Sequence, residues 1–163
     1  MKVETPRLVL EPLSRGDEAA WAALLADERI VRSLHFPDPH TRAQASDLLE
    51  RTIERARGDV AMYTARLRER GEVAGFVGFA TRQMEWGEEL ELGWSLFPDF
   101  QGRGLATEAA LALRPLVPGR VISLIRVENE ASQNVARKIG MHHERDIEHV
   151  GFPTRVYASS APR

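Results

Sequence analysis

The chain has 163 residues, 43% of them hydrophobic and 28% charged, with a formal net charge of −2 at pH 7. This length fits one domain with one hydrophobic core, residues 1–163, and the small net charge argues against a nucleic acid or an anionic membrane surface as partner. Because the chain has no cysteine, disulfides, thiolate catalysis and cysteine metal sites are excluded.

The N-terminus lacks the apolar segment of a signal peptide, and no apolar run approaches the roughly 20 residues of a membrane span. We therefore expect a cytoplasmic protein. In chain order, the apolar run at residues 8–13 contains Pro12 near its end and predicts the first strand. Asp17 can cap a helix that reaches residue 27. Residues 30–40 contain two prolines and are expected to be loop, and residues 41–57 predict a second helix with a mixed-charge outer face.

The second half predicts a meander, two helices around a buried strand, and a closing hairpin. The meander has strands at 62–67, 73–81 and 89–97; a helix at 105–113, a strand at 121–127, a helix at 129–139 and a hairpin of 141–147 with 154–158 follow. Residues 159–163 are expected to be a frayed tail. The order is β-αα-βββ-α-β-α-ββ, an α+β fold in one domain.

A glycine turn, Gln101-Gly102-Arg103-Gly104, runs directly into the alanine-rich helix. Glycines at this spacing let the backbone approach a ligand closely, and the helix start adds about half a positive charge. The turn predicts a phosphate site, although many such turns only connect elements. The chain has no G-x-x-x-x-G-K-S/T motif, and Ala106 replaces the third glycine of a dinucleotide fingerprint. Nucleotide hydrolysis and hydride transfer are therefore not indicated.

The turn does match the Q-x-x-G-x-A form of an acyl-CoA pyrophosphate loop, preceded by the strand Glu91-Leu92-Gly93-Trp94. On these motifs and on the element order, almost the whole chain resembles the GCN5-related N-acetyltransferases (GNAT). Residues 5–10, 91–94 and 129–141 look most like the RimJ/RimL branch. The resemblance implies a mixed sheet splayed between the fourth and fifth strands, with acetyl-CoA as acyl donor. It also implies a primary amine as acceptor, either a protein N-terminus, such as that of a ribosomal protein, or a small molecule.

The resemblance also implies where coenzyme A is held. The pyrophosphate contacts fall on the glycine turn and the first turn of the helix, namely Gln101, Gly102, Arg103, Gly104, Leu105, Ala106 and Thr107. Arg103 can add positive charge there, or be an exposed arginine in water. The pantetheine arm lies between splayed strands, so backbone N–H groups near Trp94 and Leu96 are expected to polarise the thioester carbonyl. Asn129 and Asn134 occupy the family's asparagine positions, although by residue type they predict a helix cap and a solvated side chain.

Two side chains are predicted to move protons. Glu91 is the candidate base, acting through water, with a solvated strand carboxylate as the alternative interpretation and Glu148 as a weaker candidate base. Many family members have a tyrosine in the last long helix as proton donor, whereas this chain has Ala136 in that region and no tyrosine nearby in sequence. Ser132 is expected to replace it, although a serine in a first helical turn is also an ordinary cap.

No metal site is expected, because the adjacent residues of His142-His143-Glu144 point to opposite faces of a strand. The leading hypothesis is an acetyl-CoA-dependent N-acetyltransferase whose acceptor enters between residues 30–40 and 149–154. The alternative, motivated by the missing tyrosine, is a catalytically inactive CoA-binding regulatory module. The sequence fixes neither the acceptor nor the oligomeric state, monomer or homodimer.

Overall fold

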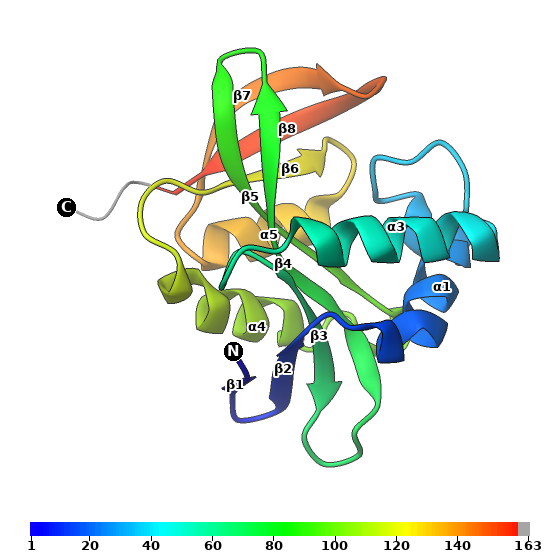
Figure 1. The fold of residues 1–163 in the computed structure, drawn as a ribbon. Helices are drawn as coiled ribbons and strands as arrows, with labels where there is room; N and C mark the ends of the chain where they lie inside the picture. Colours follow the sequence, from blue (N-terminus) through cyan, green and yellow to red (C-terminus); the bar gives the residue numbers. More distant parts are fainter. Residues whose placement is uncertain (160–163) are drawn as a thin grey trace.

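The computed structural model describes residues 1–159, which form one mixed sheet of eight strands with helices on both faces (Figure 1). The strands are β1 Val3–Glu4, β2 Leu8–Pro12, β3 Met62–Leu67, β4 Val73–Met84, β5 Gly87–Leu96, β6 Ile122–Arg126, β7 His142–His149 and β8 Phe152–Ala158. The helices are α1 Glu18–Ala26, α2 Glu28–Val31, α3 Arg42–Arg55, α4 Leu105–Leu113 and α5 Glu130–Lys138, with short 3-10 turns at Arg15–Asp17, Pro98–Phe100 and Arg114–Leu116.

The strand order is β1-β2-β3-β4-β5-β6-β8-β7, and β5 with β6 is the one parallel pair among the described residues. The α+β class and the splayed mixed sheet predicted from the sequence are confirmed. No helix within residues 1–159 has both the length and the apolar character needed to cross a membrane.

The helices cover the two faces of β4 through alternate side chains. Phe76 faces α1 and α3, where its ring meets Trp21 edge to face at a centroid distance of 5.0 Å. Val77, the next residue, faces α4 and packs in a cluster with Leu105 and Ala109. This alternation of apolar residues on both faces is the pattern of a strand buried between two layers of helices.

Three local expectations differ from the structure. Residues 28–31 form the short helix α2 inside a region expected partly as loop, because Asp27 Oδ1 accepts the N–H of Arg29 and caps a turn. The two-residue strand β1 was not predicted, being too short for a periodic signal. Ser159, expected in the frayed tail, donates its N–H to the Val121 carbonyl at 2.9 Å; the rest of that tail lies outside the described residues.

Candidate functional site

A cleft of about 950 Å³ opens where β5 and β6 separate. Its walls come from β4, β5, the starts of α4 and α5, and the loop between α2 and α3. The predicted site residues that line it are Glu91, Trp94, Leu96, Gln101, Gly102, Gly104, Leu105, Ala106, Thr107, Asn129, Ser132 and Asn134. The fold thus brings together side chains predicted from three separate segments of the chain.

The cleft exists because the ladder between β5 and β6 is very short. Within residues 1–159, Glu91 and Ile122 are the one pair of Cα partners between these strands, and β6 continues beside β8 instead. The Ser123 hydroxyl donates to the Leu92 carbonyl at 2.6 Å and satisfies a backbone group that has no ladder partner. Beyond this point, the edge of β5 that faces β6 is open to the cleft.

Backbone donors on this open edge can be identified from the register. Phe97 donates its N–H to the Ala74 carbonyl of the β4 side at 2.9 Å. Because an antiparallel ladder alternates bonded and non-bonded pairs, the N–H groups of Trp94 and Leu96 point away from β4. They therefore point toward the cleft, where such donors can polarise a carbonyl oxygen.

The turn before α4 presents a run of free backbone donors. Gly102 and Gly104 have φ angles of +74° and +76°, which glycine adopts without a Cβ clash. Among residues 1–159, the backbone N–H groups from Gly102 to Thr107 have no hydrogen-bond acceptor. Together with the positive end of the α4 dipole, these donors form a site suited to phosphate groups.

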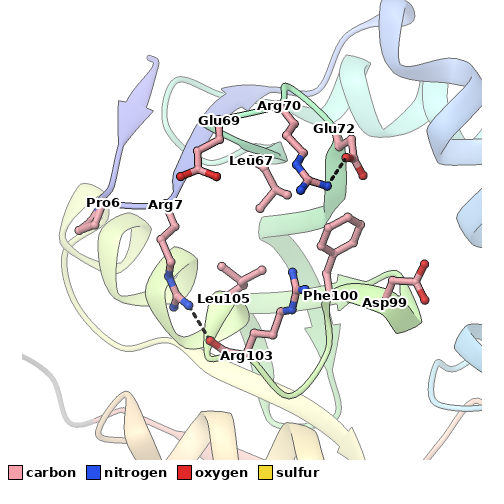
Figure 2. A pocket seen from close by; sticks show the side chains of 10 residues that line it. All are labelled: Pro6, Arg7, Leu67, Glu69, Arg70, Glu72, Asp99, Phe100, Arg103 and Leu105. Atoms are coloured by element: carbon pink, nitrogen blue, oxygen red, sulfur yellow. Dashed lines mark hydrogen bonds and ion pairs between the residues drawn. The ribbon is translucent and has the colours of Figure 1, made fainter.

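The side chains of the turn do not add to this run of donors. Gln101 Nε2 donates to the Leu96 carbonyl at 2.9 Å, which ties the turn to the end of β5. Arg103 lies outside the cleft, in a separate pocket of about 480 Å³ with Arg7 and Phe100 (Figure 2). Its guanidinium is 5.8 Å from the centre of the Phe100 ring, and its carbonyl accepts from Arg7 Nη1 at 2.8 Å. This placement favours the solvated arginine over a charge that faces the cleft.

Helix α5 carries Ser132 into the cleft. Asn129 Oδ1 accepts the Ser132 N–H at 3.1 Å and caps the helix, as its residue type predicts. The Ser132 hydroxyl oxygen accepts from Trp94 Nε1 at 3.2 Å, so the helix and the open end of β5 meet at this serine. Asn134 is exposed at the rim of the cleft, and its Oδ1 accepts from Arg137 at 2.7 Å.

A tyrosine does reach α5, contrary to expectation, but from its buried side. Tyr157 of β8 donates to Gln133 Oε1 at 3.1 Å and accepts from Arg137 at 3.2 Å. This contact could not be predicted from the sequence, because Tyr157 and Gln133 are 24 residues apart and the pairing of β8 with β6 brings them together. Tyr157 is not part of the cleft lining, whereas the Ser132 hydroxyl is.

Glu91 on β5 also lines the cleft and is paired with Arg82 of β4. No motif near Arg82 in the sequence predicts this pairing. The Glu91 side chain is 13% exposed, and Oε2 accepts from Arg82 Nε at 2.5 Å. The β4–β5 register, with Ala80 opposite Glu91, brings Arg82 beside it. Glu148, the weaker candidate base, is exposed on β7 and outside the cleft lining.

His35, from the loop between α2 and α3, also lines this part of the cleft. Its Nε2 lies 2.8 Å from the Thr154 hydroxyl, which donates its one proton to the Phe152 carbonyl at 2.9 Å. This hydroxyl thus joins the loop between α2 and α3 to strand β8. Burial, helped by the neighbouring His149, lowers the pKa of His35 to about 4, so the ring is neutral at pH 7.

The passage expected between residues 30–40 and 149–154 is bridged by direct contacts. Besides the bond from His35 to Thr154, the rings of His35 and His149 lie 5.1 Å apart. Arg126 Nη1 also donates to the Leu34 carbonyl at 3.3 Å. The cleft also reaches the surface beside Thr81 and Arg82, both of which line it and are exposed.

Within residues 1–159, no group of three or more His, Asp or Glu side chains is arranged to hold a metal ion. Two residues of the run His142-His143-Glu144, considered above as possible metal ligands, instead form ion pairs or hydrogen bonds with other side chains. His143 Nε2 lies 2.6 Å from Asp146 Oδ1, and Glu144 pairs with Arg120 at 2.7 Å.

The chain is similar to known proteins in both sequence and fold. Residues 7–142 match the family model described as an acetyltransferase (GNAT) domain. YkkB, an uncharacterized protein of Bacillus subtilis strain 168, is 28% identical over 162 residues, which cover 96% of this chain and 94% of YkkB. The crystal structure of an acetyltransferase from Agrobacterium tumefaciens strain C58 superposes with a TM-score of 0.81 at 26% identity, covering 97% of this chain and 93% of that one. RimL, a ribosomal L7/L12 alpha-N-protein acetyltransferase in complex with coenzyme A, shares the fold at a TM-score of 0.82 and 21% identity, with 99% and 98% covered.

Proposed function

The chain belongs to the GNAT family of acetyl-CoA-dependent N-acetyltransferases, and from this premise we propose that it moves an acetyl group to a primary amine by direct attack in a ternary complex. One observation carries the proposal. The run of free N–H groups from Gly102 to Thr107 opens into the same cleft as the carboxylate of Glu91 and the hydroxyl of Ser132. A phosphate site, a base and a proton donor in one cleft are what acyl transfer from a CoA thioester requires.

The backbone holds and activates acetyl-CoA in this proposal. The N–H groups from Gly102 to Thr107 bind the pyrophosphate, and the pantetheine arm enters the gap between β5 and β6. The N–H groups of Trp94 and Leu96 accept the growing negative charge of the carbonyl oxygen. Asn129 and Asn134 also line the cleft and are the residues proposed to flank the arm.

The proton steps use two side chains. The amine nitrogen attacks the thioester carbon, and Glu91 takes the proton from that nitrogen through a water molecule. The C–S bond then breaks, and Ser132 passes a proton to the departing thiolate while its own oxygen takes one from solvent. At pH 7 an α-amine of pKa near 7.8 is only about 1.1 kcal/mol from neutral, against about 4.6 kcal/mol for a lysine amine, so α-amines need little help from the base.

Two acceptor classes agree with this chemistry. Residues 5–10, 91–94 and 129–141 resemble the RimJ/RimL branch and favour a protein N-terminal amine, such as that of a ribosomal protein. The same cleft can take the α-amine of a small molecule. No nucleic acid or metal takes part in either case, and a cytoplasmic enzyme, as monomer or homodimer, fits both.

Calorimetric titration with acetyl-CoA tests the proposal, with desulfo-CoA and a free adenine nucleotide as controls. We expect saturable binding of acetyl-CoA that is clearly tighter than that of the nucleotide, followed by release of CoA thiol when an amine is added. Absence of binding at millimolar concentration would contradict the phosphate site. Binding without CoA release from any amine or peptide would instead indicate the inactive CoA-binding module.

A further inference from the structure

Glu91 and Arg82 form an ion pair of opposite charges inside the cleft, with the carboxylate deeper than the guanidinium. The side chain of Glu91 is 13% exposed and that of Arg82 is 44% exposed. Their bond of 2.5 Å joins Nε of the arginine to one carboxylate oxygen. A ligand entering past Arg82 therefore meets a planar set of donors first and a carboxylate behind it.

This pair is distinguished from the many surface ion pairs by its position. Glu91 is the one carboxylate in the cleft lining that residues 1–159 provide. The neighbouring His35 is held in its neutral form by burial and by the nearby His149, which lower its pKa to about 4. The local charge pattern is therefore a dipole, which is complementary to a ligand that carries an amine and an acidic group close together.

The closed side of the cleft limits the size of that ligand. His35 bonds to Thr154 at 2.8 Å, and Arg126 bonds to the Leu34 carbonyl at 3.3 Å, across the route where an extended chain would leave the site. A protein N-terminus would have to break these contacts to pass between the loop and the hairpin. A small molecule can approach Glu91 past Arg82 without breaking them.

From the ion pair and the closed side together we propose that the acceptor is a small zwitterion of the amino-acid type. Its amine lies toward Glu91 and its carboxylate, or an equivalent acidic group, binds the outer edge of the Arg82 guanidinium, whose fork geometry suits a carboxylate. This inference rests on the proposed function and names the substrate class of that same site. It makes Arg82 the residue that determines acceptor specificity.

The test is a comparison of kcat/KM, with saturating acetyl-CoA, between each proteinogenic L-amino acid and its carboxamide. The carboxamide keeps the α-amine but lacks the negative charge, and its less basic amine is more often unprotonated. Any preference for the amino acid must therefore come from binding of the carboxylate. We expect at least about a tenfold preference, the effect of one charge-assisted hydrogen bond. Peptides with a free N-terminus and a diamine complete the panel.

Substitutions of Arg82 test whether this residue binds the acceptor carboxylate or only neutralises the charge of Glu91. Arg82→Gln should remove the preference by lowering kcat/KM for the amino acid about 10- to 100-fold more than for the carboxamide. Arg82→Lys should keep part of it, because the charge remains and the fork is lost. Arg15→Gln is the matched control, since it breaks an exposed pair with Glu50 at 2.7 Å outside the cleft and should leave the ratio unchanged.

Three results would overturn the inference. Equal or better turnover of carboxamides, peptides or the diamine would leave the transferase function standing and exclude the zwitterion. An equal loss for both substrates in Arg82→Gln would mean that Arg82 only neutralises Glu91. If acetyl-CoA binds but no amine in the panel releases CoA, the proposed transferase function itself is contradicted, and the inference with it.

Discussion

The hydroxyl of Ser123 on β6 donates a 2.6 Å hydrogen bond to the carbonyl of Leu92 on β5, across the point where the two strands part. Ser123 is 2% exposed, and Leu92 is fully buried. One side-chain bond thus replaces the ladder bond that a parallel neighbour would supply. The widening gap that we propose admits the pantetheine arm begins directly beyond it.

Replacement of this hydroxyl should destabilise the fold. Ser123→Ala leaves the buried Leu92 carbonyl without a donor, and we expect the free energy of unfolding to fall by about 1–3 kcal/mol. For a chain of this size that corresponds to a loss of roughly 2–4 °C in Tm per kcal/mol, measurable by thermal unfolding. Ser33→Ala, at an exposed serine, should leave Tm unchanged. Equal Tm values for the two variants would contradict a structural role for the Ser123 bond.

The proposed phosphate site should be sensitive to charge at the start of α4. Gly104→Asp adds a negative charge next to the free N–H groups, and we expect the affinity for acetyl-CoA to fall by about 100-fold or more, because like charges in contact cost several kcal/mol. Gly104→Asn is the matched control, since it has the same shape, tolerates the φ of +76° and carries no charge. Calorimetry compares the two. The same loss in both variants would point to backbone strain and away from an anion site.

Removal of the candidate base should affect turnover and leave cofactor binding unchanged. Glu91→Gln keeps an oxygen for Arg82 but loses the basic carboxylate. We expect kcat to fall by about 10²- to 10⁴-fold at pH 7 with the Kd for acetyl-CoA unchanged. Steady-state kinetics and calorimetry on the same preparation give both numbers. A normal rate would assign deprotonation to another group or to solvent.

Loss of the proposed proton donor should have a smaller effect. A thiol of pKa near 8.5 leaves readily, so Ser132→Ala should lower kcat by only about tenfold. Ser132→Thr retains a hydroxyl beside Trp94 and should recover most of the rate. Should the threonine variant be as slow as the alanine variant, the serine would be acting through packing against the indole, and proton donation would be excluded.

His35 predicts an acid-labile fold. The unfolded imidazole binds a proton as the pH falls below about 6.5, whereas the folded one, with its pKa lowered to about 4 chiefly by burial, stays neutral. Between these values the unfolded state holds more protons, so stability is lost as the pH falls from 6.5 to 4. His35→Gln, which can still donate to Thr154, should flatten the Tm profile in this window, and His142→Gln, at an exposed histidine, should not. Parallel profiles for His35→Gln and the unaltered protein would refute this.

Most helices and strands could be predicted from short segments of the sequence. Helix α4 spans the predicted residues 105–113, and β3 spans the predicted residues 62–67. In both cases the signal lies within a few residues: glycines before the helix, a proline soon after it, and an apolar run bounded by turn residues. The donors of the Gly102 to Thr107 turn were predictable for the same reason, because they belong to one glycine turn and one helix start.

The contacts around Glu91 could not be predicted from any short segment of the sequence. Arg82 meets Glu91 through the register of two strands, and His35 meets Thr154 across 119 residues of chain. Arg103 shows the converse, because its position in the motif suggested a cofactor contact while the turn directs its side chain to the pocket with Phe100. Side-chain direction depends on the backbone path around a residue, which a motif does not specify.

The sequence by itself predicted most of the element order, the glycine turn proposed to bind phosphate, and Glu91 and Ser132 as candidate residues, because spacing along one segment sets these properties. Only the tertiary structure decided that Arg82 pairs with Glu91, that His35 is buried and neutral beside Thr154, and that the loop and the last hairpin are joined by direct contacts. Those features depend on strand register and burial. Both arise from packing between segments distant in the chain, which is why an acceptor site could be proposed only once the fold was known.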